Sequence, residues 1–163
     1  MVNLTAILRD GAILSAIASV ILMASLRINP RSYLQDYPPA IQALVPPKTP
    51  AERRLALIVG IPFMILLIAV PLLSTLALKR SGVTAFLPLA LHAFGVVWIF
   101  NVVDWLVLDW LIFCAITPAF VVIPGSEGHP AYKDYGFHFR GFLKGSAISA
   151  AAGLLIGGIV ALV

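Results

Sequence analysis

Two aspartates inside an apolar stretch are the residues of this sequence that are best placed to do chemistry. Asp104 and Asp109 lie between Thr84 and Ile116, a stretch that contains no Lys, Arg or Glu. A carboxylate that faces acyl chains in a bilayer costs several kcal/mol, so both side chains are expected to face protein or water. Ionisable groups in such places mark functional sites by default. The pair therefore predicts a site that responds to protons or cations.

Other polar and aromatic side chains are expected on the same face of the helix. An α-helix turns by about 100° per residue, which places Trp98, Asn101 and Trp105 with the two aspartates in an arc of about 140°. We expect Asn101 to orient a bound group and the two tryptophans to wall a pocket. The same geometry sets Asp104 about 140° from Asp109, which argues against the adjacent carboxyls of an aspartic-protease dyad.

A second group of candidates follows in the segment from Pro118 to Lys144. Aromatic residues alternate there with Lys and Arg, a composition that suits a membrane interface and an anion site about equally. Titratable groups that an interfacial anchor does not require favour the site. The candidate residues of this segment are Glu127, His129, His138 and Arg140. We expect the two histidines and Arg140 to close the mouth of the pocket and attract an anionic headgroup.

Several kinds of chemistry are excluded by composition and spacing. The single cysteine, Cys114, excludes an internal disulfide and a CxxC redox pair. The histidines and acids of the Pro118–Lys144 segment match neither HExxH nor a zinc-finger pattern, so no metal site is predicted. The sequence has no Walker A motif and no dinucleotide-binding glycine pattern, and the cofactor is left unassigned. Because no cluster of four or more basic residues occurs, no nucleic acid partner is expected.

The elements that must position these residues are membrane-spanning helices. The chain has 163 residues, of which 61% are hydrophobic and 11% charged, whereas soluble domains usually carry about a quarter charged residues. An ordinary soluble globule is therefore excluded. About 20 apolar helical residues cross a bilayer, and the charge-poor stretches predict spans at 4–27, 51–78, 84–116 and 141–162. We expect an all-α, polytopic membrane protein that forms one four-helix transmembrane bundle over residues 1–163.

The connections between these spans differ in composition. Six of the twelve prolines lie in the first loop, where Pro39 to Val45 predicts a turn or two of interfacial helix or a plain Pro-rich connector. The third loop is rich in Gly and aromatic residues. Thr49, Pro50 and Glu52 form the pattern of a capping box and predict the start of the second span.

Charge and small residues predict how the spans are oriented and packed. Eight of the eleven Lys and Arg residues lie in the first and third loops or at the adjoining ends of the spans, between Arg27 and Arg54 and between Lys133 and Lys144. This excess predicts cytoplasmic long loops and external termini in a bacterial-type inner membrane. Small residues recur every four positions in the last span, at Gly141, Gly145, Ser149, Gly153 and Gly157. Such a stripe lets helices approach closely, either inside the bundle or at a contact with a second copy or another membrane protein. Packing inside the bundle is the simpler expectation.

The sequence favours one function and leaves two others open. The favoured function is a small integral membrane protein whose buried acidic and aromatic pocket binds or translocates a small molecule, an ion or a lipid. One alternative is an integral-membrane enzyme that acts on a lipid-like substrate, with Asp109, His129 or His138 in acid–base roles. The other is an accessory or structural subunit of a membrane complex. Membrane lipids are the expected partners in every case, and whether the protein is an enzyme is left open.

Overall fold

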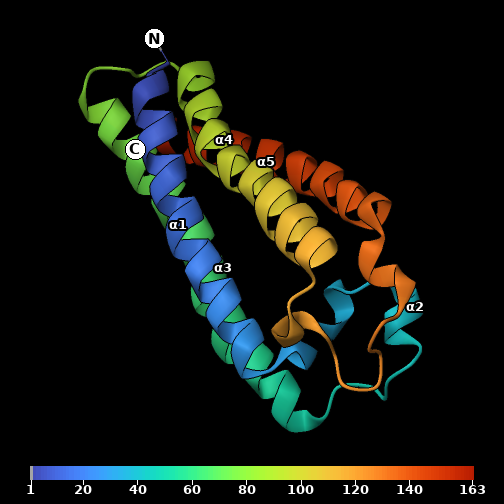
Figure 1. The fold of residues 1–163 in the computed structure, drawn as a ribbon. Coiled ribbons are helices and arrows are strands. Elements are labelled where there is room, and N and C mark those ends of the chain that lie inside the picture. Colours follow the sequence, from blue (N-terminus) through green and yellow to red (C-terminus); the bar gives the residue numbers. More distant parts are fainter. Residues whose placement is uncertain (1) are drawn as a thin grey trace.

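The protein is a bundle of long helices, and the computed structural model describes residues 2–163 (Figure 1). Within those residues the regular structure is helical throughout. The long helices are α1 (Leu4–Ile28), α3 (Pro50–Arg80), α4 (Phe86–Val103) with its continuation η2 (Asp104–Ile116), and α5 (Tyr135–Leu162). The short helices of the connections are η1 (Pro30–Asp36), α2 (Pro39–Gln42), η3 (Ala119–Val121) and η4 (Pro130–Lys133).

Four of these helical segments are long and apolar enough to cross a membrane, as the composition predicts. The first three predicted spans agree with the observed helices within two residues at each end. The fourth span is wrong at its start, because α5 begins at Tyr135 rather than near 141. The side chain of Asp134 accepts a hydrogen bond from the Phe137 N–H at 2.8 Å and caps the helix there. The last six residues of the predicted third loop, 135–140, are therefore the first turns of α5.

The third span changes its helical geometry halfway. At Asp104 α4 continues directly into η2, a π-helix of 13 residues. A π-helix joins each carbonyl to the N–H five residues later, so residues five apart lie roughly one above the other. The separation of about 140° predicted for Asp104 and Asp109 is therefore wrong, because it assumed α-helical rotation. The two aspartates lie on the same face of η2. The angle between them therefore no longer argues against a pair of adjacent carboxyls.

The small residues of α5 are used for packing against α4. A Cβ atom built on Gly157 would lie 2.5 Å from Ala90 Cα, and one on Gly153 would lie 2.7 Å from Phe94 Cβ. Gly145 is equally close to the Asn101 side chain. The backbones can approach so closely only because these side chains are absent. Gly145, Gly153 and Gly157 of the stripe thus pack within the chain, whereas Gly141 faces open space.

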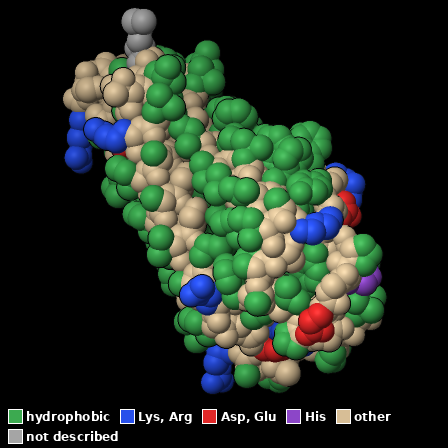
Figure 2. Space-filling model, viewed as in Figure 1, with side chains coloured by type: hydrophobic (Ala, Val, Ile, Leu, Met, Phe, Trp, Pro, Cys, Tyr) green, Lys and Arg blue, Asp and Glu red, His purple; other side chains and the backbone are tan. Residues whose placement is uncertain are grey.

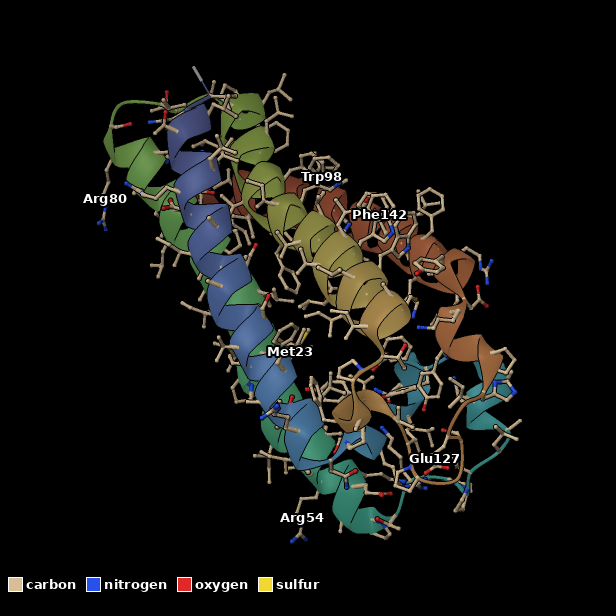
Figure 3. The ribbon with its side chains drawn as sticks, viewed as in Figure 1. Met23, Arg54, Arg80, Trp98, Glu127 and Phe142 are labelled. Atoms are coloured by element: carbon tan, nitrogen blue, oxygen red, sulfur yellow. The ribbon has the colours of Figure 1, made fainter. Side chains whose placement is uncertain are left out.

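The two ends of the bundle are different in character. Both termini and the α3–α4 connection lie at one end, and both long connections lie at the other (Figure 1). Arg80 lies at the first end, whereas Arg54 and Glu127 lie at the second (Figure 3). The visible surface between them is mainly hydrophobic (Figure 2). At the first end, the Lys79 ammonium donates to Val160 O at 2.8 Å, which satisfies a carbonyl in the last turn of α5.

The long connections fold together into a small apolar cluster. The Tyr37 hydroxyl donates to the carbonyl of Val121 at 2.8 Å, and the Tyr132 hydroxyl accepts from the N–H of Ile123 at 2.9 Å. Arg31 pairs with Glu52 at 2.6 Å and so ties η1 to the first turn of α3, where the predicted capping box is confirmed. These contacts fix η1 against the end of the bundle.

The contact between α4 and α5 predicts that alanine is destabilising at one of two adjacent glycines and tolerated at the other. Gly157→Ala would force a Cβ against the Ala90 backbone, so we expect a loss of about 1–3 kcal/mol, seen as a thermal midpoint lower by several degrees. Gly158→Ala serves as the matched control, because its Cβ would meet nothing closer than Phe86 Cε2 at 3.8 Å. Thermal unfolding in mild detergent measures both. Equal midpoints for the two variants would contradict the observed packing.

Candidate functional site

A cavity of about 990 Å³ lies in the half of the bundle nearer the long connections. It is bounded by α1, α3, α5 and the junction of α4 with η2, and η1 contributes to its lining at the loop end. Figure 3 shows the side chains that these helices direct toward one another. The polar residues of the lining include Ser32, Gln35, Asp36, Asn101, Asp104, Asp109, His138 and Lys144.

The acidic lining comes from two separate elements. Asp104 and Asp109 lie on one face of the π-helix η2, and Asp36 reaches the same cavity from the end of η1. Among the residues that the structure describes, no side chain or backbone group forms a hydrogen bond or salt bridge with the Asp104 carboxylate. Asp104 is thus a cavity-lining acid whose partner the protein itself does not supply.

Asp109 is paired with a histidine from the neighbouring helix. Its Oδ1 lies 3.0 Å from His138 Nδ1, and the His138 side chain is 5% exposed. The rings of Phe113 and Phe137 pack against the imidazole and hold it in place. With Nδ1 directed at Asp109, Nε2 is the hydrogen-bond acceptor of a neutral imidazole. Nε2 has no hydrogen-bond partner within residues 2–163.

Asp36 is held by the folded first connection. Gln35 Nε2 donates to Asp36 Oδ2 at 2.6 Å. The residue lines the cavity and is exposed, and nearby protein atoms displace part of the water around its carboxyl. This burial raises the pKa of Asp36 above the ordinary aspartate value and the charge of Asp109 adds to the rise, whereas Gln35 and Lys48 oppose it.

Asn101 and Trp105 join the acidic face to α5. Asn101 Nδ2 donates to the Phe142 carbonyl at 3.1 Å and to Ser146 Oγ at 3.0 Å. The Trp105 ring stacks on Phe142 with centroids 4.3 Å apart, and its indole N–H is buried without a hydrogen-bond partner in the described chain. Both residues line the cavity. Asn101 therefore fixes helix spacing, and Trp105 forms part of a wall.

Four of the residues predicted from the sequence lie outside this cavity. Trp98 is 38% exposed and donates to Ser146 Oγ at 3.1 Å, beside Phe142 (Figure 3). Glu127 is exposed in the third connection, where its own backbone N–H and that of Gly125 hold the pKa of its carboxyl below the ordinary value. His129 Nδ1 accepts from the Ala131 N–H at 3.1 Å and starts η4. Arg140 is exposed on α5. The structure brings together Asn101, Asp104, Trp105, Asp109 and His138.

The first connection supplies residues that sequence reasoning missed. Ser32 and Asp36 reach the cavity because η1 folds back over the end of the bundle. Local signals for η1 were present: Asn29 accepts a hydrogen bond from the Arg31 N–H at 2.9 Å, and Pro30 occupies the first helical position. Lys144 was also missed, because it was assigned to a loop and lies on α5. The direction in which η1 folds depends on the distant contact between Tyr37 and Val121.

The rim of the cavity is apolar where α3 and α5 border it. Leu57, Ile61 and Ile65 of α3 line the cavity and are 57–61% exposed. Ile148 of α5 also lines the cavity and is 68% exposed. A side chain that borders both the cavity and the outside marks an opening between them. All four residues are aliphatic and lie within helices able to span a membrane, so this opening is lined by side chains suited to contact with acyl chains.

The raised pKa of Asp36 predicts how stability depends on pH. Between the ordinary aspartate pKa of about 3.9 and its raised value, the folded state binds more protons than the unfolded state. The free energy of unfolding therefore falls as pH rises through that window. In Asp36→Asn we expect this fall to disappear and the protein to be more stable than wild type at pH 7, by a small amount because Asp36 also faces open space.

Thermal midpoints between pH 4 and pH 7 measure the Asp36 effect. Glu127→Gln is the control of opposite sign, because a carboxyl with a lowered pKa stabilises the fold above its ordinary pKa. An Asp36→Asn profile with the same slope as wild type would show that Asp36 is not the group responsible.

Comparisons of the chain with models of protein families, with curated proteins and with solved structures found no match. What the cavity can bind is therefore argued from its own residues.

Proposed function

We propose that this integral membrane protein binds a lipid-like amphiphile in the cavity between η1, α3, η2 and α5. The observation that carries the proposal is the polarity of the lining. Acids and a histidine form one side, and exposed aliphatic side chains of α3 and α5 form the rim. An amphiphile matches both surfaces, with its chain among the aliphatic residues and its polar head at Asp104 and Asp109.

The size of the cavity supports this class of ligand. Ligand pockets usually measure about 300–1,000 Å³, and this cavity of about 990 Å³ lies at the upper limit. A hydrated inorganic ion would leave most of that volume unfilled. A molecule with a flexible chain fills it and removes aliphatic surface from water, at about 25 cal/mol per Å².

Binding is favoured over translocation by the packing of the other half of the bundle. Leu14, Ala18 and Val96 are completely buried between α1 and α4. Beyond them, Ser74 Oγ donates to Asp10 Oδ2 and lies 2.7 Å from His92 Nε2, so these three side chains are held together, while His92 Nδ1 has no partner in the described chain. A ligand that entered from the rim would meet this packed half and remain in the cavity.

The protein is proposed to lie in a bacterial-type inner membrane with its long connections in the cytoplasm. The excess of Lys and Arg in the first and third connections supports this orientation. The cavity would then lie in the inner leaflet, with Asp36 and His138 near the cytoplasmic headgroups. An amphiphile could enter between α3 and α5 without leaving the bilayer.

Two glycines that face open space allow the cavity to be filled without disturbing the bundle. Gly60 of α3 and Gly141 of α5 line the cavity, and a Cβ built on either would meet no atom within 4 Å. In Gly60→Phe/Gly141→Phe we expect loss of bound amphiphile by at least about tenfold, because the two rings occupy the volume of the chain. Native mass spectrometry after equilibration with dodecanol measures the bound fraction.

Ala147→Phe is the matched control, because Ala147 is exposed on α5 and does not line the cavity. We expect it to retain dodecanol as wild type does. Thermal midpoints show that all variants are folded. If the double variant bound as much dodecanol as wild type, the cavity would not be the binding site.

A second candidate function is an integral-membrane enzyme with a lipid-like substrate. The specific observation in its favour is the contact between Asp109 and His138, since a carboxylate-oriented histidine is a common general base. His129 lies outside the cavity and takes no part. In this case His138→Gln should reduce hydrolysis of long-chain p-nitrophenyl esters by about 100-fold or more, and His129→Gln should not. Equal rates in both variants, or no hydrolysis by wild type, would count against an esterase.

A further inference from the structure

The charged groups that line the cavity are mainly acidic. The lining contains the acids Asp36, Asp104 and Asp109. Lys144 is the single Lys or Arg of the described lining. Lys144 forms no salt bridge with any of these acids. Charges removed from water need a partner of opposite sign, or they become neutral. An occupant that brings positive charge would complete this lining.

The protein partners of these acids are few. Asp109 has the His138 contact, and Asp36 accepts the hydrogen bond from Gln35. Lys48, the cation nearest to Asp36, is directed to the Ser32 carbonyl at 3.0 Å and to the Gln35 side chain. Within residues 2–163, Asp104 is left without any donor. The Asp104 carboxyl is therefore free to pair with an occupant of the cavity.

Buried polar atoms around the cavity give an independent indication of a missing ligand. His138 Nε2, Ser32 Oγ and Trp105 Nε1 are buried without a hydrogen-bond partner in the described chain, and all three residues line this cavity. The His138 and Ser32 residues are 5% and 2% exposed. Most buried polar side-chain atoms in proteins are satisfied. Three of the four such atoms in the described chain belong to residues that line this cavity, and the fourth, His92 Nδ1, lies in the other half of the bundle. This concentration points to a ligand with polar hydrogens and acceptors in its head.

The kind of positive charge follows from the acceptors and from the aromatic neighbours. Carboxylates accept hydrogen bonds, as does His138 Nε2 when it carries no proton, and a primary ammonium donates three of them. A quaternary ammonium has no N–H and is usually held by an aromatic cage. Trp105 is already stacked on Phe142 and packs at 4.8 Å against Trp110. These rings contact one another instead of forming a cage.

We propose that the head group bound by this cavity carries a primary ammonium, which donates hydrogen bonds to Asp104 and to the acceptors beside it. The inference rests on the proposed function, since the chain of the same molecule occupies the aliphatic part of the cavity. Asp104 is the main partner, and the pair of Asp109 and His138 supplies further acceptors. Ser32 and Trp105 are available as donors to an oxygen of the head.

The test compares amphiphiles that share one chain and differ in the head. The wild-type protein in phosphatidylcholine nanodiscs is titrated with dodecylammonium, dodecyltrimethylammonium and dodecanol at equal mole fractions in the bilayer. Thermal midpoints and native mass spectrometry report binding. We expect dodecylammonium to bind at least about tenfold more tightly than the other two, as one charge-assisted hydrogen bond allows. This comparison needs no substitution and does not depend on the folding of a variant.

Two substitutions then locate the preference. Asp104→Asn keeps the shape of the side chain and removes its charge, so we expect the preference for dodecylammonium to be lost while dodecanol still binds. Glu127→Gln removes an equal charge outside the cavity and should leave the preference intact. Survival of the preference in Asp104→Asn would overturn the assignment of Asp104.

The outcomes separate the two proposals. Equal binding of all three amphiphiles, abolished by Gly60→Phe/Gly141→Phe, would overturn the ammonium inference and leave the amphiphile site standing. Stronger binding of dodecyltrimethylammonium would also overturn it, in favour of recognition without N–H donors. Binding of each amphiphile that is unchanged in the double variant would overturn both proposals.

Discussion

The π-helical geometry of η2 is the constraint on which the candidate site depends. An α-helix that continued through residues 104–116 would place Asp104 and Asp109 at the two edges of an arc of about 140°, too far apart to share one site closely. Hydrogen bonds between residues five apart place both on the face that lines the cavity. π-Helical geometry is rare, and its usual form, a single-turn bulge in an α-helix, is frequently found at functional sites. The π-helical backbone of η2 therefore accounts for the position of both acids at the cavity.

The packing around η2 keeps this geometry in place. Upstream, the glycines of α5 bring its backbone against Ala90 and Phe94, which fixes the approach of α5 to α4. Downstream, the contact of Asp109 with His138 joins η2 to the first turns of α5. The folded connections close the loop end through Tyr37 and Tyr132. The cavity is the space left where α3 and α5 bound it without packing together, and its polar side belongs to the rigid part of the bundle.

The sequence predicts the spans well, and the site in part, for physical reasons. Long charge-free stretches have few alternatives to membrane helices, and aspartates within them have few alternatives to an inward position. The change from α- to π-geometry was not predictable, because both helices suit the same apolar residues. His138 was assigned to a loop because the cap at Asp134 lies in a segment rich in turn-forming residues. Asp36 could not be placed, since η1 is positioned by contacts between residues more than 80 apart in the chain.

The distribution of buried residues along α3 has a mechanical consequence. Its fully buried residues, Pro71, Thr75 and Leu78, all lie in the last third of the helix. The first third is fastened chiefly by the ion pair of Glu52 with Arg31, and Pro62 interrupts the backbone hydrogen bonds between the two regions. Under the proposed function, movement of this less firmly anchored third of α3 would let the cavity accept chains of different width.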